Sequence, residues 1–273
     1  MLTGDLRKMK TALNSNGEAN YALRLFDKAS GELTTEIGLN EYIGKELSIQ
    51  FLDKIHCTSC GVTVKKTYLG GLCYKCLNEA PEGSPCIIRP ELCEAHLGKG
   101  RDVQWEEENH NQPHVVYLAA TNVIKVGVTR KTQVPTRWID QGAASAIRFA
   151  ETPNRYLAGV LEVALKDAFT DKTNWRKMLT NETDDSLDLE TAKWEMEELL
   201  PSDLAEYMVD DDEITEIAYP VLNYPNKVKS LNLSKTPLIS GRLTGIRGQY
   251  LIFNEGEVFN VRSYAGYHVA VEL

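Results

Sequence analysis

Four cysteines in the first third of the chain constrain its fold more than any other feature. The stretch CTSCGVTVKKTYLGGLCYKC places Cys57 and Cys60 in one CxxC pair, and Cys73 and Cys76 in a second. Two such pairs at this spacing typically bring four thiolates onto one tetrahedral zinc ion. Free thiols or a redox pair are the alternative, but a redox CxxC usually begins a helix in a βαβ context that is missing here. The spacing therefore predicts a zinc ribbon with a structural Zn²⁺.

A second, less regular set of candidate ligands follows. Cys86 and Cys93 lie in SPCIIRPELCEAH, and three histidines come after them, His96, His110 and His114. Two cysteines with two of these histidines would complete another zinc site, and we select His96 and His110 as the pair. Packed thiols with surface histidines fit the irregular spacing equally well. This segment has little periodic apolar pattern and so lacks a hydrophobic core of its own. A bound zinc ion would stabilise it instead.

The composition is that of a globular chain without membrane spans. Its 273 residues, 42% of them hydrophobic, suffice for a sizeable core in two or three units. No stretch approaches the roughly 20 apolar residues of a membrane helix, and the N-terminus lacks the apolar run of a signal peptide. We expect a cytoplasmic protein with no membrane partner, whose six cysteines serve as metal ligands rather than disulfides.

Charge is distributed unevenly along the chain. The formal net charge is -9, yet residues 115–179 hold ten basic against five acidic residues. Residues 180–217 hold fifteen acidic residues and one lysine. Because local charge steers ligands more than the total does, an acidic chain can still carry a phosphate-binding face.

The acidic segment contains one amphipathic helix pattern. Four apolar residues have helical spacing, and they are Leu189, Ala192, Met196 and Leu199. The pattern ends at Pro201. The charged face of this helix is either solvated, or it shields a phosphate-binding surface or contacts a basic protein partner.

Five segments follow from these patterns, and together they predict an α+β chain. They are a β segment (1–56), the metal-binding region (57–114), an α/β core (115–179), the acidic helical segment (180–217) and a second β segment (218–273). The two β segments alternate polar and apolar residues over short stretches. We expect them to pair into one barrel-like sheet.

The core begins with a predicted β-hairpin, HVVYLAATNVIKVGVTR. A three-residue turn at 120–122 would place Tyr117 opposite Lys125. One face would then be aliphatic and face a core; it consists of Val116, Leu118, Ile124, Val126 and Val128. The other face groups Tyr117, Lys125 and Gly127, where a ligand could approach the backbone closely.

A predicted helix follows at 155–169, with a glutamate in its apolar run. Its buried stripe is expected at Leu157, Leu161, Ala164, Leu165 and Ala168. Glu162 lies one turn after Ala158 and Gly159, small residues that would leave open space above the carboxylate. Such a carboxylate near basic groups suits Mg²⁺. The alternative is a surface ion pair with Lys166, worth a few tenths of a kcal/mol.

The segment 115–179 resembles the core of GIY-YIG nucleases. VVY at 115–117 stands where that family has GIY, and KVG at 125–127 stands where it has YIG. The resemblance implies a catalytic set of Tyr117, Lys125, Arg137 and Glu162, with the glutamate binding the metal ion. The longer string from the cysteines through KVGVTR, RWIDQGA and DKTNW also resembles an uncharacterised bacterial family of zinc-binding proteins.

One departure from the GIY-YIG pattern bears on mechanism. The family's second tyrosine lies near the attacking water, and Lys125 replaces it here. A lysine with an ordinary pKa of about 10.4 is protonated at neutral pH, so it suits phosphate binding better than proton abstraction.

Three functions are consistent with these features. The first is a zinc-binding, nucleic-acid-binding protein that hydrolyses phosphodiester bonds as a Mg²⁺-dependent endonuclease. The second is a module that binds DNA or RNA without cleaving it. The third is a zinc-braced protein-interaction module whose acidic segment contacts a basic partner.

Overall fold

The described part of the chain divides into two compact units. The computed structural model describes residues 1–28, 30–165, 174–182, 184 and 186–273. Unit 1 consists of Met1–Asn78, Ile139–Gln141 and Ala218–Leu273, and unit 2 of Glu79–Trp138 and Gly142–Ile217. The boundary after Asn78 falls inside the predicted metal-binding region, so the two cysteine sets belong to different units.

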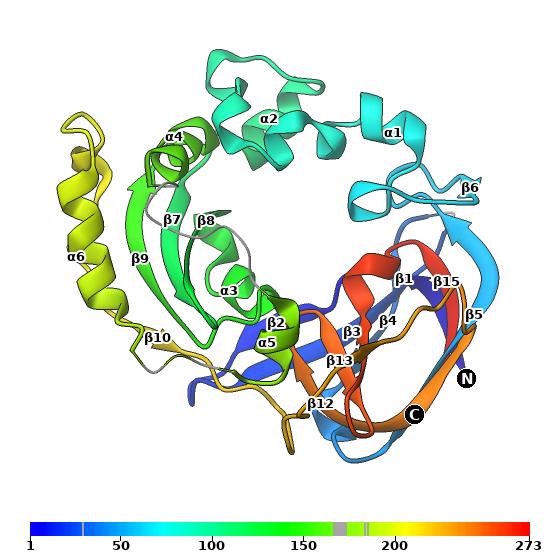
Figure 1. Cartoon of the computed structure of the whole chain (residues 1–273). Coiled ribbons are helices and arrows are strands. Elements are labelled where there is room, and N and C mark those ends of the chain that lie inside the picture. Colours follow the sequence, from blue (N-terminus) through cyan, green and yellow to red (C-terminus); the bar gives the residue numbers. More distant parts are fainter. Residues whose placement is uncertain (29, 166–173, 183, 185) are drawn as a thin grey trace. The chain divides into compact units, whose positions relative to one another are not determined.

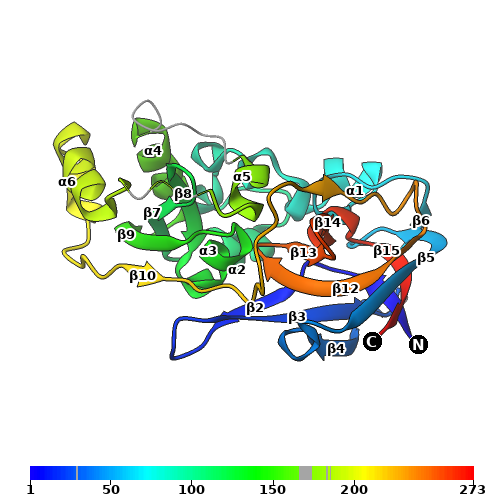
Figure 2. The same cartoon turned by 60° about the horizontal axis from the view of Figure 1, so that its bottom comes forward.

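Unit 1 is built on one eleven-stranded sheet to which both ends of the chain contribute (Figure 2). The order is β11-β14-β13-β12-β5-β15-β1-β3-β2, with β4 on β3 and β6 on β5. The strands are β1 (Leu2–Leu6), β2 (Lys10–Leu13), β3 (Ala19–Phe26), β4 (Leu33–Gly38), β5 (Glu46–His56), β6 (Thr63–Val64), β11 (Lys229–Ser230), β12 (Leu238–Arg247), β13 (Tyr250–Phe253), β14 (Glu257–Asn260) and β15 (Tyr267–Glu272).

The two terminal β segments pair within this sheet, as expected, but they form no barrel. Antiparallel ladders join β1 to β15 and β5 to β12, so strands from both ends alternate in the middle of the sheet. In the residues that the structure describes, the order is an open path that ends at the short strands β11 and β2. End strands of two and four residues offer too few ladder positions to pair with each other and close the sheet.

Unit 2 contains a four-stranded antiparallel sheet of order β10-β9-β7-β8 (Figure 1). Its strands are β7 (His114–Ala120), β8 (Ile124–Arg130), β9 (Ser145–Thr152) and β10 (Thr215–Glu216). The α-helices in the described residues are α1 (Tyr74–Glu79), α2 (Val103–Asn109), α3 (Thr136–Asp140), α4 (Arg155–Leu165), α5 (Trp175–Leu179) and α6 (Leu189–Leu199). The central elements follow the chain order β7-β8-α3-β9-α4, with β7 between its two neighbours.

The aliphatic face of the β7–β8 hairpin is the core of unit 2, as the alternation predicts. Val116 and Leu118 belong to one buried hydrophobic cluster with residues of α4 and α6, and the partly buried Ile124, Val126 and Val128 pack against it. Both helices contact β7 and β9, and α4 also contacts β8. Each fully buried leucine in this cluster contributes on the order of 2 kcal/mol by removal of its side chain from water.

The predicted register of this hairpin is wrong by two residues. Tyr117 pairs with Gly127, and Lys125 pairs with Ala119, because the turn lies at residues 121–123 rather than 120–122. A shift by two preserves the face on which each side chain lies, because side chains alternate with period two. The face assignments therefore hold although the partners change.

Helix α6 forms where the acidic segment predicts it. Asp188 caps its N-terminus, with its carboxylate accepting from the amides of Glu190 and Thr191 at 3.0 and 3.1 Å. Leu189, Ala192 and Met196 are buried as expected. Leu199 is 59% exposed, contrary to the expected stripe, because Leu200 packs on the core after the helix ends.

Helix α4 is described from Arg155 to Leu165, so the predicted positions Lys166 and Ala168 lie outside the described residues. Its buried face holds Ala158, Gly159, Leu161 and Leu165. The described helices include none long and apolar enough to cross a membrane.

Candidate functional site

The four cysteines of the CxxC pairs come together in unit 1. The sulfur atoms of Cys57, Cys60, Cys73 and Cys76 all lie within 4.8 Å of one another. Cys60 Sγ is 3.9 Å from Cys73 Sγ, and the amide of Cys73 donates to Cys57 Sγ at 3.1 Å. The second pair begins helix α1, so its turn aims both thiols at those of the first pair. This group could hold a metal ion such as zinc.

The surroundings of these thiols favour the charged form at one position and oppose it at another. Burial acts to raise the pKa of Cys57, but the amides of Cys60, Cys73 and Ser59 outweigh it and lower that pKa to about 7. Burial raises the pKa of Cys76 to about 12. Cysteine binds a metal ion as the thiolate, so ion binding by these four cysteines would release protons.

A glycine allows the close approach that this cluster needs. Gly71 has φ +94°, a conformation that favours glycine, and a Cβ there would collide with Thr58 Cγ2 and lie 2.8 Å from the carbonyl oxygen of Ala265. The segment before Cys73 can therefore pack closely against the strand end that carries Cys57.

A second group of four candidate ligands lies in unit 2. Cys86, Cys93, Glu106 and His110 are all buried, and their ligand atoms lie within 4.8 Å of one another. His110 Nδ1 is 3.8 Å from Cys86 Sγ and also hydrogen-bonds with Glu106 Oε2. Thiolate, imidazole and carboxylate are all zinc ligands.

Sequence reasoning missed Glu106 as a member of this group. Glu106 and His110 are four residues apart, on one face of α2 and its C-terminal cap. That spacing was the available signal, since both side chains point the same way.

The two other histidines considered as ligands from the sequence, His96 and His114, lie outside this group. His96 stacks on Tyr156 with ring centroids 4.6 Å apart, and its buried Nδ1 has no hydrogen-bond partner in the described part of the chain. His114 is fully buried, with Nδ1 2.7 Å from the carbonyl oxygen of Gln112. Burial lowers the pKa of His114 to about 4, so it is neutral at physiological pH.

The second group is joined directly to helix α4. Arg155 Nε donates to the carbonyl of Cys86, and its terminal nitrogen donates to that of Ile87, both at 3.0 Å. The amide of Arg155 donates to the carbonyl of His110 at 2.9 Å. The start of α4 is therefore held by the backbone of the loops that carry the candidate ligands.

The open space expected beside Gly159 is filled. A Cβ at Gly159 would collide with the backbone of Pro90 and Glu91, because the short 3₁₀ helix Pro90–Leu92 packs onto α4 there. The glycine serves this contact rather than access to Glu162.

The space beside Gly127 is also occupied from within. Tyr117 is 1% exposed, and its hydroxyl would lie 2.5 Å from a Cβ at Gly127. Its ring lies 5.9 Å from that of Trp138. The glycine thus accommodates the buried phenol, and the expected close approach of a ligand at this point is not available.

Arg137 of α3 and Glu162 of α4 both act electrostatically on Arg155, which begins α4. Burial lowers the pKa of Arg155, the carboxylate of Glu162 opposes that shift, and the guanidinium of Arg137 adds to it. Arg137, Glu162 and Lys125 are all partly buried. Glu162 is outside the groups of candidate metal ligands found in the described residues, so it is a single carboxylate in electrostatic reach of Arg155.

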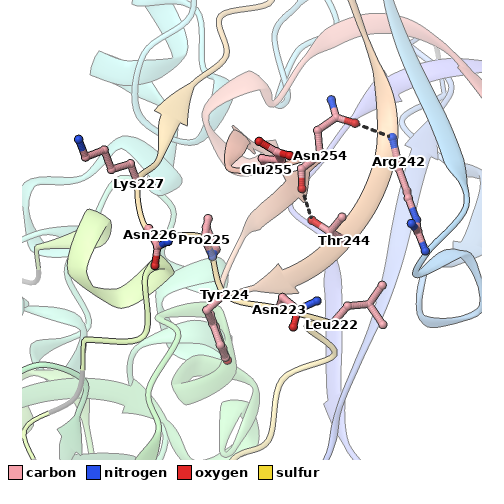
Figure 3. Close-up of a pocket in the computed structure, with 10 residues that line it drawn as sticks. All are labelled: Leu222, Asn223, Tyr224, Pro225, Asn226, Lys227, Arg242, Thr244, Asn254 and Glu255. Carbon is pink, nitrogen blue, oxygen red and sulfur yellow. Dashed lines mark hydrogen bonds between the residues drawn. The ribbon is translucent and has the colours of Figure 1, made fainter.

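A pocket in unit 1 contains none of the predicted site residues. Its volume is about 570 Å³ and its side chains are mainly polar (Figure 3); it is lined by Leu222, Asn223, Tyr224, Pro225, Asn226, Lys227, Arg242, Thr244, Asn254 and Glu255. Within it, Asn254 Oδ1 accepts from the amide of Arg242 at 3.1 Å.

Comparison with known proteins places most of the chain in one family. The model of a family described as a protein of unknown function, DUF2797, matches residues 44–269. No curated protein and no solved structure matches the chain.

Proposed function

Because the chain belongs to DUF2797, a family of proteins of unknown function, we propose its function from its sites. It is a zinc-binding, nucleic-acid-binding protein with a GIY-YIG-like core that hydrolyses phosphodiester bonds. The observation that carries this proposal is the β7-β8-α3-β9-α4 order, with Arg137 and Glu162 both acting electrostatically on Arg155 at the start of α4.

The arginines and the lysine supply the phosphate-binding charge. Arg137 and Lys125 would neutralise the charge that develops on the scissile phosphate. Arg155 is fixed by two carbonyl acceptors, so it maintains positive potential beside Glu162 without moving. Tyr117 is buried against Gly127, which favours a role in positioning the strands over proton abstraction.

Glu162 is the residue that would hold Mg²⁺. One carboxylate is sufficient for this ion, which keeps several waters and takes further ligands from substrate phosphates. When bound, it would polarise the phosphate and lower the pKa of a bound water. The partly buried carboxylate, in electrostatic reach of Arg155, fits a site that gains its remaining ligands from the substrate.

The two cysteine groups would hold structural zinc. Four thiols in unit 1, and two thiols with an imidazole and a carboxylate in unit 2, are donor sets that leave no open position on a tetrahedral ion. The second group would also fix the start of α4, since Arg155 binds its carbonyls.

Two further proposals rest on specific observations. Lys125 in place of the family's tyrosine favours a module that binds nucleic acid without cleaving it. The exposed Trp194 and the acidic residues of α6 favour a basic protein partner. Part of the acidic segment is engaged already, since Asp211 pairs with Arg148 and Asp212 with Lys193.

Binding of nucleic acid is tested with charge-matched double variants. We expect the Lys125→Ala/Arg137→Ala protein to bind labelled DNA and RNA at least about 10-fold more weakly, and with a shallower salt dependence, than the wild type. The control is Lys227→Ala/Lys235→Ala, which removes the same charge from exposed positions in unit 1. Equal loss in both variants, or no binding by the wild type at low salt, would contradict the proposal.

A further inference from the structure

We propose that unit 1 contains a third metal site, formed by Asp5, His56 and His268, which binds a divalent ion of the zinc class. One ligand atom from each lies within 4.8 Å of the other two. Asp5 Oδ1 is 2.9 Å from His56 Nδ1 and 2.8 Å from His268 Nδ1. The site contains no cysteine, and it is independent of the nucleic-acid function proposed above.

Three neighbouring strands bring these residues to one point. The sheet order places β15 between β1 and β5, and Asp5 on β1 lies opposite His268 on β15. His56 ends β5, where its amide donates to the carbonyl of Gly266 at 2.7 Å. These contacts fix all three backbones around the cluster.

The β5–β15 ladder is irregular at this position. Its register shifts between Tyr267 and Val269, so His268 lies at the irregularity. On the facing strand, Asp53 has φ 55°, which is uncommon for a residue other than glycine. Bulged strands redirect a side chain out of the regular alternation, and this one turns His268 toward Asp5.

The burial of these three side chains and the types of their donor atoms are those of a metal site. Asp5 and His56 side chains are 1% exposed, and His268 is 28% exposed. A buried carboxylate requires a compensating cation or several hydrogen bonds. Both imidazole Nδ1 atoms lie within hydrogen-bonding distance of Asp5 Oδ1, and that of His56 also lies 2.8 Å from Oδ2. Two imidazoles with one carboxylate bind zinc and related ions with a coordination position left open. The partly exposed His268 places that position on the solvent side.

Arg7 is a cation in electrostatic reach of this site. Its guanidinium acts electrostatically on both Asp5 and Cys57, and burial lowers its pKa. Its guanidinium donates hydrogen bonds to the carbonyls of Leu6 and Thr58. The oxygens of the Asp5 carboxylate thus have both imidazoles as hydrogen-bonding neighbours.

Cobalt titration of the full chain tests this site. Metal-free protein is titrated with Co²⁺, total bound cobalt is measured by mass spectrometry, and thiolate-to-cobalt charge transfer is followed by absorbance. We expect His268→Ala and Asp5→Asn to bind about one equivalent less cobalt than the wild type, with unchanged charge-transfer intensity. Unchanged intensity also shows that the variants still fold around their cysteine groups.

The matched control replaces a histidine that belongs to none of the three groups. His96→Ala should bind as much cobalt as the wild type. If His268→Ala and Asp5→Asn also bind the wild-type amount, the trio is a hydrogen-bonded cluster and the proposal is overturned. Because no nucleic acid is used, that failure is distinct from failure of the proposed function.

Discussion

Replacement of Glu162 by glutamine is expected to abolish Mg²⁺-dependent cleavage of nucleic acid while leaving binding intact. Glutamine has nearly the same shape, but it lacks the negative charge that would hold the ion. Several kcal/mol of transition-state stabilisation would be lost, which corresponds to a rate reduction of about 100-fold or more. Single-turnover cleavage of labelled DNA and RNA with Mg²⁺ or Mn²⁺ measures the rate, and a gel-shift assay measures binding.

The control for this variant is another glutamate of unit 2. Glu198→Gln on α6 removes one exposed carboxylate from the acidic segment and should cleave at the wild-type rate. Equal cleavage by Glu162→Gln and wild type would show that this carboxylate holds no catalytic ion. Binding without cleavage by the wild type would favour the non-catalytic module, as the replacement of tyrosine by Lys125 suggests.

Replacement of Cys73 by serine is expected to remove one zinc ion and to destabilise unit 1 strongly. Its sulfur lies 3.9 Å from that of Cys60, and its amide donates to Cys57, so it links both CxxC pairs. Structural zinc supplies much of the folding free energy of small metal-bound segments, and we expect a loss on the order of 3 kcal/mol or more. Zinc content and thermal unfolding measure the two effects.

A neighbouring substitution separates metal loss from local disruption. Tyr74→Phe changes the next, exposed residue and should keep the full zinc content and the wild-type unfolding temperature. A Cys73→Ser protein with unchanged zinc content would show that these thiols hold no metal ion. A chelator should lower the stability of the wild type toward that of the variant.

Local sequence patterns predicted those features that are formed by residues close to one another in the sequence. The CxxC pairs converge because each pair lies in one tight turn. The aliphatic face of β7 and β8 follows from alternation alone, and it survived an error in register. The exact turn was not predictable, because several positions near Ala120 offer similar turn residues.

Contacts across the chain were not predictable from one sequence. The Asp5–His268 contact joins residues 263 positions apart and depends on which strands become neighbours. The packing of Pro90 against Gly159 filled a space that the helix pattern alone left open. The sheet did not close into a barrel, since its end strands are too short, and strand alternation carries no information on that length.

Cross-linking of nucleic acid to the protein tests the central claim most directly. The wild type would be irradiated with a photoreactive oligonucleotide at low salt and without Mg²⁺, and the modified peptides identified by mass spectrometry. We expect the adducts to concentrate in β8, α3 and α4, which carry Lys125, Arg137 and Glu162. Adducts confined to unit 1, for example around the pocket at Asn223 and Lys227, or no adducts at all, would contradict it.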